Sequence, residues 1–375
     1  MQFRDLHAQY AALKPEIDAA IQSVIDSSGF ILGKPVTELE DKLAAYVGRK
    51  HCIGVANGTE ALQLALMAMD VGPGDAVFTS DFTYFASAGC ASIVGATPIL
   101  VDIDLATFNM SPKALEEAIK RVLAEGKLTP KVIIPVDLFG LPADFTAILP
   151  VAEKYGLKVL EDAAQGFGGS INGKLACSFG DMSATSFFPA KPLGCYGDGG
   201  AIFTDSDEID QRLRSLRASG KSPEDKYDNR EVGMNSRLDT IQAAILLPKF
   251  KAFVGYELDD VNAAADRYTA ALQGKVVTPT VPAGFRSSWA QYTIMMKDRA
   301  TRDAAQKKLK EKSIPSMVYY PRGLHQQAAY RWMQLGDKRY PNTIEATNRV
   351  LSLPMHPHLG GEEQQSIIDA VLEVL

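Results

Sequence analysis

The chain has 375 residues, 46% of them hydrophobic, which is enough apolar material for a full core and about two domains. Lys and Arg total 39 and Asp and Glu total 45, so the formal net charge is −6 at pH 7. The sequence has no long basic run and no interleaving of basic with aromatic residues, which are the patterns that bind a nucleic-acid backbone. A nucleic-acid partner is therefore not expected.

The cysteine pattern and the hydropathy pattern favour a cytoplasmic protein. The four cysteines lie far apart, without a C-x-x-C pair or a histidine spacing typical of structural zinc, which favours free thiols and no metal site. The opening "MQFRDLHAQY" carries charges where a signal peptide has its apolar region. The uncharged run from Tyr84 to Leu100 contains Gly, Ser, Thr and Pro, so it predicts a helix, a turn and a strand rather than a membrane span.

Short β-branched or aromatic runs alternate with segments of helical period along the first part of the chain. The predicted strands are "CIGVAN" from Cys52, "AVFTS" from Ala76, "PILVDID" from Pro98, "VIIPVDLFG" from Val132, "KVLEDAA" from Lys158, "SATSFFP" from Ser183 and "AIFTD" from Ala201. The predicted helices between them include "TEALQLALMAM", "SPKALEEAIKRVLAEG" and "DFTAILPVAEKYG". This alternation is typical of an α/β protein with a mainly parallel sheet, in which ligands bind at the carboxyl ends of the strands.

The pattern changes after a predicted long amphipathic helix that begins in "RLDTIQAAILLPKF". We expect this helix to join a large domain, residues 1–250, to a smaller one, residues 251–375. From Lys275 onward strands are fewer, prolines are scattered and the chain closes on "GEEQQSIIDAVLEVL". This composition predicts a smaller C-terminal α+β domain.

Polar residues follow two of the predicted strands. In "NGTEALQLAL", Gly58 and Thr59 open a helix, where free N–H groups and the helix dipole attract anions, although an ordinary N-cap gives the same pattern. In "VLEDAAQGFGG", the strand ends in Glu161 and Asp162, with Gln165 one turn later. Such an acid is a metal ligand, a cap, or a partner that keeps a heterocyclic nitrogen protonated.

A single lysine lies in the glycine-rich stretch "SFFPAKPLGCYGDGG". Lone lysines are usually solvated, but a partly buried amine beside closely approaching backbone is a nucleophile. Tyr84 follows another strand and either stacks on an aromatic ligand or belongs to the core. An anion site, a stacking ring, an acid and an embedded Lys191 together describe a phosphorylated aromatic aldehyde held as a Schiff base, which is how proteins hold pyridoxal phosphate.

The ordered motifs of the chain resemble the DegT/DnrJ/StrS family of sugar aminotransferases over nearly its whole length. The motifs are "DLHAQYAALKPEI", "FILGKPVTELE", "NGTEAL", "EDAAQ", "SFFPAKPLGCYGDGG", "GMNSRLDTIQAAI" and "LSLPMHPHL". The resemblance implies a fold type I aminotransferase: a mixed, mostly parallel seven-stranded sheet covered by helices, a smaller C-terminal α+β domain, and pyridoxal 5'-phosphate as cofactor.

The resemblance also implies a role for each matching residue, and Lys191 and Asp162 are the predicted catalytic residues. The predicted cofactor contacts are Lys191 at the Schiff base, Asp162 at the ring nitrogen, Gln165 at the ring hydroxyl, Tyr84 against the ring face, and Gly58, Thr59 and Ser186 at the phosphate. Asn235 would reach the phosphate of the partner subunit. This last contact implies a homodimer with shared active sites.

In this family L-glutamate donates the amino group, leaves as 2-oxoglutarate, and a nucleotide-linked keto sugar accepts it, for amino-sugar and surface-polysaccharide biosynthesis, including lipopolysaccharide. The first and sixth motifs most resemble members that aminate C3 of a UDP-linked 2-acetamido-hexuronate, with amination at C4 as the next interpretation. The predicted substrate contacts are Arg237, Tyr319, Tyr320, Arg322 and His325.

Three positions depart from the family pattern: Asp137, where many members carry His or Ser, Asn229, where His is frequent, and the pair Arg322–Gly323, where small or apolar residues are common. All three fall in regions that the resemblance assigns to substrate, so they bear on the identity of the sugar. Two other functions stay open. One is a sugar dehydratase, in which a histidine replaces the Schiff-base lysine, so Lys191 counts against it. The other is a cofactor-binding regulatory protein without turnover.

Overall fold

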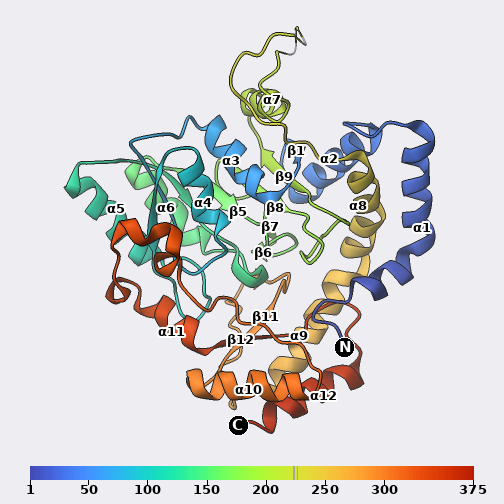
Figure 1. The fold of residues 1–375 in the computed structure, drawn as a ribbon, viewed down its shortest axis with the longest axis vertical. Helices are drawn as coiled ribbons and strands as arrows, with labels where there is room; N and C mark the ends of the chain where they lie inside the picture. Colours follow the sequence, from blue (N-terminus) through green and yellow to red (C-terminus); the bar gives the residue numbers. More distant parts are fainter. Residues whose placement is uncertain (223, 226) are drawn as a thin grey trace.

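The computed structural model describes residues 1–222, 224–225 and 227–375. In this part of the chain, the seven predicted strands form one central sheet, in the order β1-β9-β8-β5-β4-β2-β3 (Figure 1). The strands are β1 (His51–Val55), β2 (Asp75–Ser80), β3 (Thr97–Val101), β4 (Thr129–Ile134), β5 (Lys158–Asp162), β8 (Met182–Ser186) and β9 (Gly200–Thr204). The sequence-based expectation of a mixed, mostly parallel seven-stranded sheet is confirmed.

The strand directions bring the expected site residues to one edge of the sheet. β9 pairs antiparallel with both β1 and β8, whereas β8, β5, β4, β2 and β3 pair with one another in parallel. In this register Gly200 lies opposite both Val55 and Ser186. A Cβ atom on Gly200 would lie 2.6 Å from the carbonyl carbon of Asn57, so only glycine permits this close approach.

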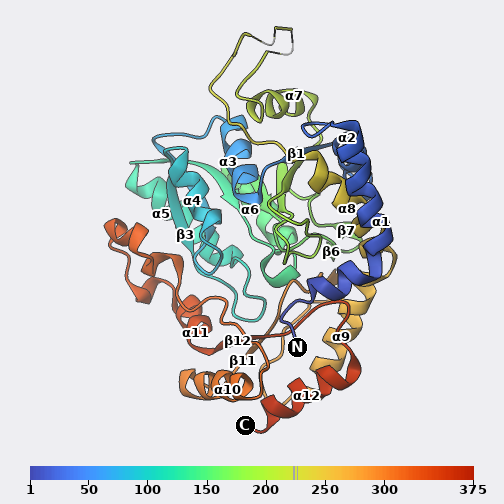
Figure 2. The ribbon, with the colours of Figure 1, turned by 45° about the vertical axis from the view of Figure 1, so that its right-hand side comes forward.

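Helices cover both faces of the sheet, as Figures 1 and 2 show. The helices of this part are α1 (Leu6–Ser27), α2 (Lys34–Val47), α3 (Gly58–Ala68), α4 (Ala86–Ile93), α5 (Pro112–Glu125), α6 (Phe145–Tyr155) and α7 (Asp207–Leu216). Alternate residues of β4 serve the two faces: Val132 and Ile134 pack in a cluster with α3, and Ile133 packs in a cluster with α5 and α6. None of the helices in the described ranges is long and apolar enough to cross a bilayer.

A continuous helical run links the sheet to the C-terminal part: α8 (Thr240–Ala252), a π-helical turn (Phe253–Glu257) and α9 (Leu258–Leu272). The remaining elements are β10 (Phe285–Arg286), β11 (Tyr292–Met295), α10 (Arg299–Glu311), α11 (Pro341–Arg349), β12 (Val350–Leu353) and α12 (Gly361–Leu372), with β6 (Ser170–Ile171) and β7 (Lys174–Leu175) pairing with β10. One apolar cluster includes residues of α2, α8, α9, β11, β12 and α12. Because this core is shared, the division of the chain at residue 250 stays a prediction.

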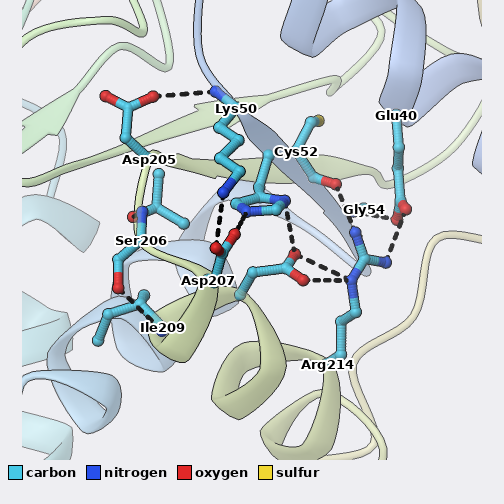
Figure 3. Close-up of polar contacts among 12 residues, drawn as sticks. Glu40, Lys50, Cys52, Gly54, Asp205, Ser206, Asp207, Ile209 and Arg214 are labelled. Atoms are coloured by element: carbon cyan, nitrogen blue, oxygen red, sulfur yellow. Dashed lines mark hydrogen bonds and ion pairs between the residues drawn. The ribbon is translucent and has the colours of Figure 1, made fainter.

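An ion-pair network fixes β1 between α2 and α7, and Figure 3 shows the contacts of Glu40, Gly54 and Arg214 within it. Glu40 of α2 accepts hydrogen bonds from Arg217 at 2.6 Å, from Arg214 at 2.9 Å and from the Gly54 amide at 2.8 Å. The side chains of Arg217 and Glu40 are each about 7% exposed. If one of the two were removed, water could not solvate the charge of the other. The carbonyl of Arg217 in turn accepts from the Ser236 amide at 2.9 Å, and the network thereby holds the segment on which Asn235 and Arg237 lie.

Candidate active site

The start of α3, which follows β1, lies against Ser186 at the carboxyl end of β8. A Cβ atom on Gly58 would lie 2.7 Å from the Cβ of Ser186, so the two predicted phosphate residues are neighbours and glycine is required at position 58. Ser236 joins them, because its hydroxyl accepts a hydrogen bond from the Ala56 amide at 3.2 Å. The structure therefore brings Gly58, Ser186 and the Asn235–Arg237 segment together.

The N-terminus of α3 presents unused hydrogen-bond donors. Asn57 caps this helix, because its side-chain oxygen accepts from the Glu60 amide at 2.9 Å. Within the described residues, the amides of Gly58 and Thr59 donate to no protein acceptor. Two free N–H groups and the positive end of the helix dipole make this position suited to an anion.

Asp162, the last residue of β5, is a buried carboxylate held in a fixed orientation. It is 4% exposed, and its oxygens accept from the Ser87 hydroxyl at 2.7 Å and from the Ala164 amide at 3.2 Å. Burial raises the pKa of Asp162, while Ser87, Ala164 and the nearby Lys191 oppose that rise. A cation bound beside this carboxylate would favour its ionised form.

Lys191 lies in a tightly folded loop between β8 and β9. Its amide donates to the Phe188 carbonyl at 2.8 Å and the Cys195 amide donates to the Phe187 carbonyl at 2.8 Å, which folds the loop back on itself. The side chain is half-buried, and its amine has no hydrogen-bond partner among the described residues. Burial lowers the pKa of Lys191 to about 8, against the opposing effect of Asp162. A substantial neutral fraction near pH 8 makes this amine a nucleophile.

Tyr84 and Gln165 also lie beside this edge, in different environments. Tyr84 is 59% exposed, so its ring is not a core residue and remains open to a ligand. Gln165 is buried; its carbonyl oxygen accepts from the Phe139 amide at 2.7 Å and its amide nitrogen donates to the Tyr320 hydroxyl at 3.2 Å. Gln165 thus connects the end of β5 to the predicted substrate segment.

The two predicted substrate arginines have uncompensated charges. Arg237 is half-buried and Arg322 is exposed, and neither forms an ion pair with any residue in the described ranges. Tyr319 packs against Phe3, with ring centroids 6.2 Å apart. The structure places Arg237 beside the Gly58 turn through Ser236, whereas Arg322 lies in the C-terminal part next to Gly323.

His325 already has a hydrogen-bond partner on each ring nitrogen. Asp81, which follows β2, contacts Nδ1 at 2.6 Å, and Asp337 contacts Nε2 at 3.0 Å, while the ring stacks on Tyr340 with centroids 4.6 Å apart. The two carboxylates raise the pKa of His325 against the effect of burial. These contacts tie the predicted substrate segment to the sheet, and a substrate contact for His325 stays a prediction.

Asp137, the first of the three departures from the family pattern, is completely buried. Its carboxyl accepts from the Ala143 amide at 2.9 Å and lies beside Glu161, and burial together with that carboxylate raises the pKa of Asp137 well above its ordinary value. Asn229, the second departure, is exposed and donates to the Ser219 carbonyl at 2.7 Å. The structure thus places Asp137 in the interior and Asn229 at the surface, and the role of either residue in the choice of sugar stays a prediction.

Sequence reasoning missed Ser87, the residue that orients Asp162. Ser87 lies in the first turn of α4, shortly after Tyr84 in the sequence. Its hydroxyl also lies 3.2 Å from the Thr83 hydroxyl. A serine in an apolar helix carries no signal of such a role, because the contact depends on packing across 75 residues of sequence.

The residues present fit pyridoxal phosphate. Free N–H groups with the Thr59 and Ser186 hydroxyls suit a phosphate, the buried Asp162 suits a protonated ring nitrogen, and Lys191 supplies an amine of low basicity. The exposed ring of Tyr84 adds a surface for an aromatic ligand.

Comparison with known proteins assigns the chain to a family. The model of the DegT/DnrJ/EryC1/StrS aminotransferase family matches residues 11–372. The UDP-2-acetamido-2-deoxy-3-oxo-D-glucuronate aminotransferase of Pseudomonas aeruginosa is 46% identical over 365 residues, which cover 96% of each chain. The UDP-N-acetyl-3-dehydro-alpha-D-glucosamine 3-aminotransferase of Acidithiobacillus ferrooxidans is 40% identical, covering 99% of this chain and 97% of that protein.

A solved structure agrees. The crystal structure of a DegT DnrJ EryC1 StrS aminotransferase from Brucella abortus superposes with a TM-score of 0.96 at 46% identity, covering 100% of this chain and 99% of that one. The chain therefore belongs to the DegT/DnrJ/EryC1/StrS aminotransferase family and is a pyridoxal-phosphate-dependent aminotransferase.

Proposed function

We propose that the protein transfers the amino group of L-glutamate to C3 of a UDP-linked 2-acetamido-3-oxo-hexuronate, with a C4 keto sugar as the next candidate. The observation that carries the proposal is the half-buried Lys191 amine, with its pKa lowered to about 8, beside the buried Asp162 at the sheet edge. The choice of sugar rests on the 46% identity to the Pseudomonas aeruginosa enzyme. The product would enter surface-polysaccharide biosynthesis, lipopolysaccharide included.

In this proposal the strand-end residues hold the cofactor. Gly58, Thr59 and Ser186 bind the phosphate, because they combine free amides with hydroxyls at the N-terminus of α3. Tyr84 lies against the ring and Gln165 reaches its hydroxyl. When bound, the cofactor supplies an electron sink for the bond that breaks at Cα of the donor.

Lys191 and Asp162 perform the chemistry that the chain itself supplies. Lys191 Nζ, neutral for part of the time near pH 8, takes the proton from Cα of the amino donor in the first half-reaction, and in the second half it delivers a proton to the sugar carbon that receives the amino group. Asp162 keeps its charge next to the ring nitrogen, with Ser87 fixing its orientation at 2.7 Å. Its negative charge favours a protonated ring nitrogen and so sustains the electron sink.

We place the sugar between the arginines and the tyrosine segment. Arg237 and Arg322 have no carboxylate partner in the part of the chain that the structure describes, and a planar guanidinium holds a phosphate or carboxylate through two hydrogen bonds. Tyr319 and Tyr320 extend this surface, with Tyr320 linked to Gln165. His325 positions the segment through Asp81 and Asp337.

The proposed enzyme works as a cytoplasmic homodimer with shared active sites. Phe30, Ile31 and Leu32 are 45%, 52% and 40% exposed, an unusual patch for a monomer. Their segment pairs with the start of α8, since Ile31 forms a β-bridge with Asp239. The exposed Asn235 lies a few residues from that bridge, where it is available to the phosphate of a partner subunit. Free, buried cysteines agree with a reducing compartment.

The proposed function is tested with purified protein, pyridoxal phosphate and 2-oxoglutarate against UDP-, dTDP- and GDP-linked 3-amino and 4-amino sugars. We expect glutamate to form fastest with the UDP-linked 3-amino-hexuronate, because the 46% identical Pseudomonas aeruginosa relative is a UDP-2-acetamido-2-deoxy-3-oxo-D-glucuronate aminotransferase and Arg237 would pair with the C6 carboxylate. Glutamate should also shift the absorbance of the bound cofactor. A protein that binds cofactor without this shift would be a regulatory binder, and loss of a hydroxyl from the sugar without glutamate formation would indicate a dehydratase.

A prediction for Arg237 separates a sugar carboxylate from other anions. If Arg237 binds the C6 carboxylate, Arg237→Ala raises KM for the uronate at least about tenfold, the cost of one charge-assisted hydrogen bond of roughly 1.5–3 kcal/mol. The change is much smaller for the same sugar with a 6-CH₂OH or 6-methyl group. The glutamate half-reaction serves as the control and stays close to normal. Equal losses for all three sugars would mean that Arg237 supports the fold, the dimer or the phosphate instead.

A further inference from the structure

The first residues of the chain contact both the Lys191 loop and the C-terminal part. The Arg4 guanidinium donates from Nη2 to the carbonyl of Pro192 at 3.2 Å, a contact across 188 residues of sequence. The neighbouring Phe3 carbonyl accepts from the Met355 amide at 3.1 Å, and its ring packs on Tyr319. Residues 3–4 therefore join the loop that carries Lys191 to two segments of the C-terminal part.

The start of α1 holds these residues in place. Asp5 caps the helix by accepting from the Ala8 amide at 2.8 Å. One turn later, Gln9 donates to both oxygens of Glu257 at 2.8 and 2.9 Å, and the Glu257 side chain is almost fully buried in the π-helical turn. Arg4 is thereby fixed from its C-terminal side by α1 and from its N-terminal side by the Phe3 contact with Met355.

The charge of Arg4 lies close to Lys191 without a tight counter-ion. Among the described residues no carboxylate is within ion-pair distance of Arg4. Burial lowers the pKa of Arg4 to about 10, and the charge of Glu257 opposes this effect. Arg4 also lowers the pKa values of Lys249 and His356. The charged groups that act on the Lys191 amine are Asp162, which raises its pKa, and Arg4, which lowers it.

We propose that Arg4 is a positioning residue for transamination: it holds the Pro192 carbonyl, and hence the Lys191 loop, and places a fixed positive charge near the amine. The inference rests on the proposed role of Lys191. Like charges disfavour one another, so Arg4 increases the neutral fraction of the amine near pH 7 to 8, which is the form that attacks an aldehyde and accepts a proton. Without Arg4, burial alone would oppose the effect of Asp162, and the amine would be more basic.

Three variants separate the two contributions of Arg4. Arg4→Gln keeps a side-chain donor for the Pro192 carbonyl and removes the charge, Arg4→Lys keeps the charge, and Arg4→Ala removes both. Arg349→Gln is the matched control, because Arg349 also donates to a backbone carbonyl, that of Met296 at 2.7 Å, in another part of the chain. Thermal unfolding of all four variants reports any general loss of stability.

The decisive measurement is the pH dependence of Lys191 acylation in the cofactor-free protein, quantified by peptide mass spectrometry, because it reports the amine itself and not turnover. In Arg4→Gln we expect labelling at pH 7 to fall about three- to tenfold, equivalent to a rise of roughly half to one pKa unit. Arg4→Lys and Arg349→Gln should label at nearly the normal rate. In the holoenzyme the pH profile of kcat for the glutamate half-reaction should move to higher pH, with KM little changed.

An unchanged labelling profile in Arg4→Gln would overturn the proposal, and so would an equal shift in Arg349→Gln. Loss of stability in Arg4→Ala without any shift would assign Arg4 to the fold alone. Failure of the proposed function is recognised separately, because mapping of the reduced cofactor adduct to another lysine removes the role of Lys191 whatever Arg4 does.

Discussion

Lys191→Ala is expected to lose covalent attachment of the cofactor and all measurable aminotransferase turnover, while the protein remains folded. The imine requires a primary amine at this position, and the same amine carries the proton, so two functions disappear together. The fold should tolerate the change because Lys191 is half-buried and its amine makes no hydrogen bond within the described residues. Borohydride reduction of the wild-type holoenzyme, followed by peptide mapping, should find the pyridoxyl group on Lys191.

Lys249 provides the matched control for this assignment. It is also buried, burial likewise lowers its pKa to about 8, and its amine lies 4.7 Å from the centre of the Tyr196 ring. Because Lys249 lies on α8 and not at a strand end, Lys249→Met should retain the attached cofactor. A pyridoxyl group on Lys249 in reduced wild-type protein would show that the assignment of Lys191 is wrong.

Mixing subunits tests the shared site that we propose. Lys191→Ala and Asn235→Ala subunits are each expected to be weakly active or inactive alone. If Asn235 serves the phosphate of the partner subunit, mixed dimers contain one site with both residues intact, and part of the activity returns. No recovery on mixing would place Asn235 and Lys191 in the same subunit's site.

The sheet was predictable because its strands carry a strong local signal. Val132, Ile133 and Ile134 are β-branched and serve both faces of a buried strand, so the run is apolar without alternation and ends in a turn signal. Once the strands were placed, their parallel direction alone predicted that Gly58, Asp162 and Ser186 would meet at one edge.

Contacts that depend on long-range packing were not predictable. The hydroxyl of Ser87 reaches Asp162 from another helix, Arg4 reaches Pro192 across 188 residues, and both ring nitrogens of His325 are used by carboxylates. None of these residues has a local pattern that distinguishes it from a surface or core residue of the same type. The burial of Asp137 beside Glu161 was likewise not predictable, because a polar residue after a strand has no local pattern that distinguishes a buried position from an exposed one.

Asp162→Asn is expected to lower kcat for the glutamate half-reaction by at least about two decades, comparable to the removal of other preorganised charge-stabilising groups. The substitution keeps the shape of the side chain, and the Asn oxygen still accepts from the Ser87 hydroxyl, which lies 2.7 Å from the native carboxylate. What disappears is the negative charge that favours a protonated ring nitrogen, so the electron sink weakens while the cofactor remains attached to Lys191.

A control variant and a spectroscopic reading distinguish the charge of Asp162 from a general disturbance of its site. Ser87→Ala removes one hydrogen bond to the buried carboxylate and keeps the charge, so we expect a loss of about tenfold, equivalent to roughly 1.4 kcal/mol and close to the lower end of the range for a hydrogen bond to a charged group. The absorbance of the bound cofactor should change with pH in Asp162→Asn, as its ring nitrogen loses the proton, and stay constant in Ser87→Ala. Near-normal turnover of Asp162→Asn would contradict the role of Asp162. Equal losses in the two variants, with unchanged spectra, would mean that β5 and α4 only hold each other in place.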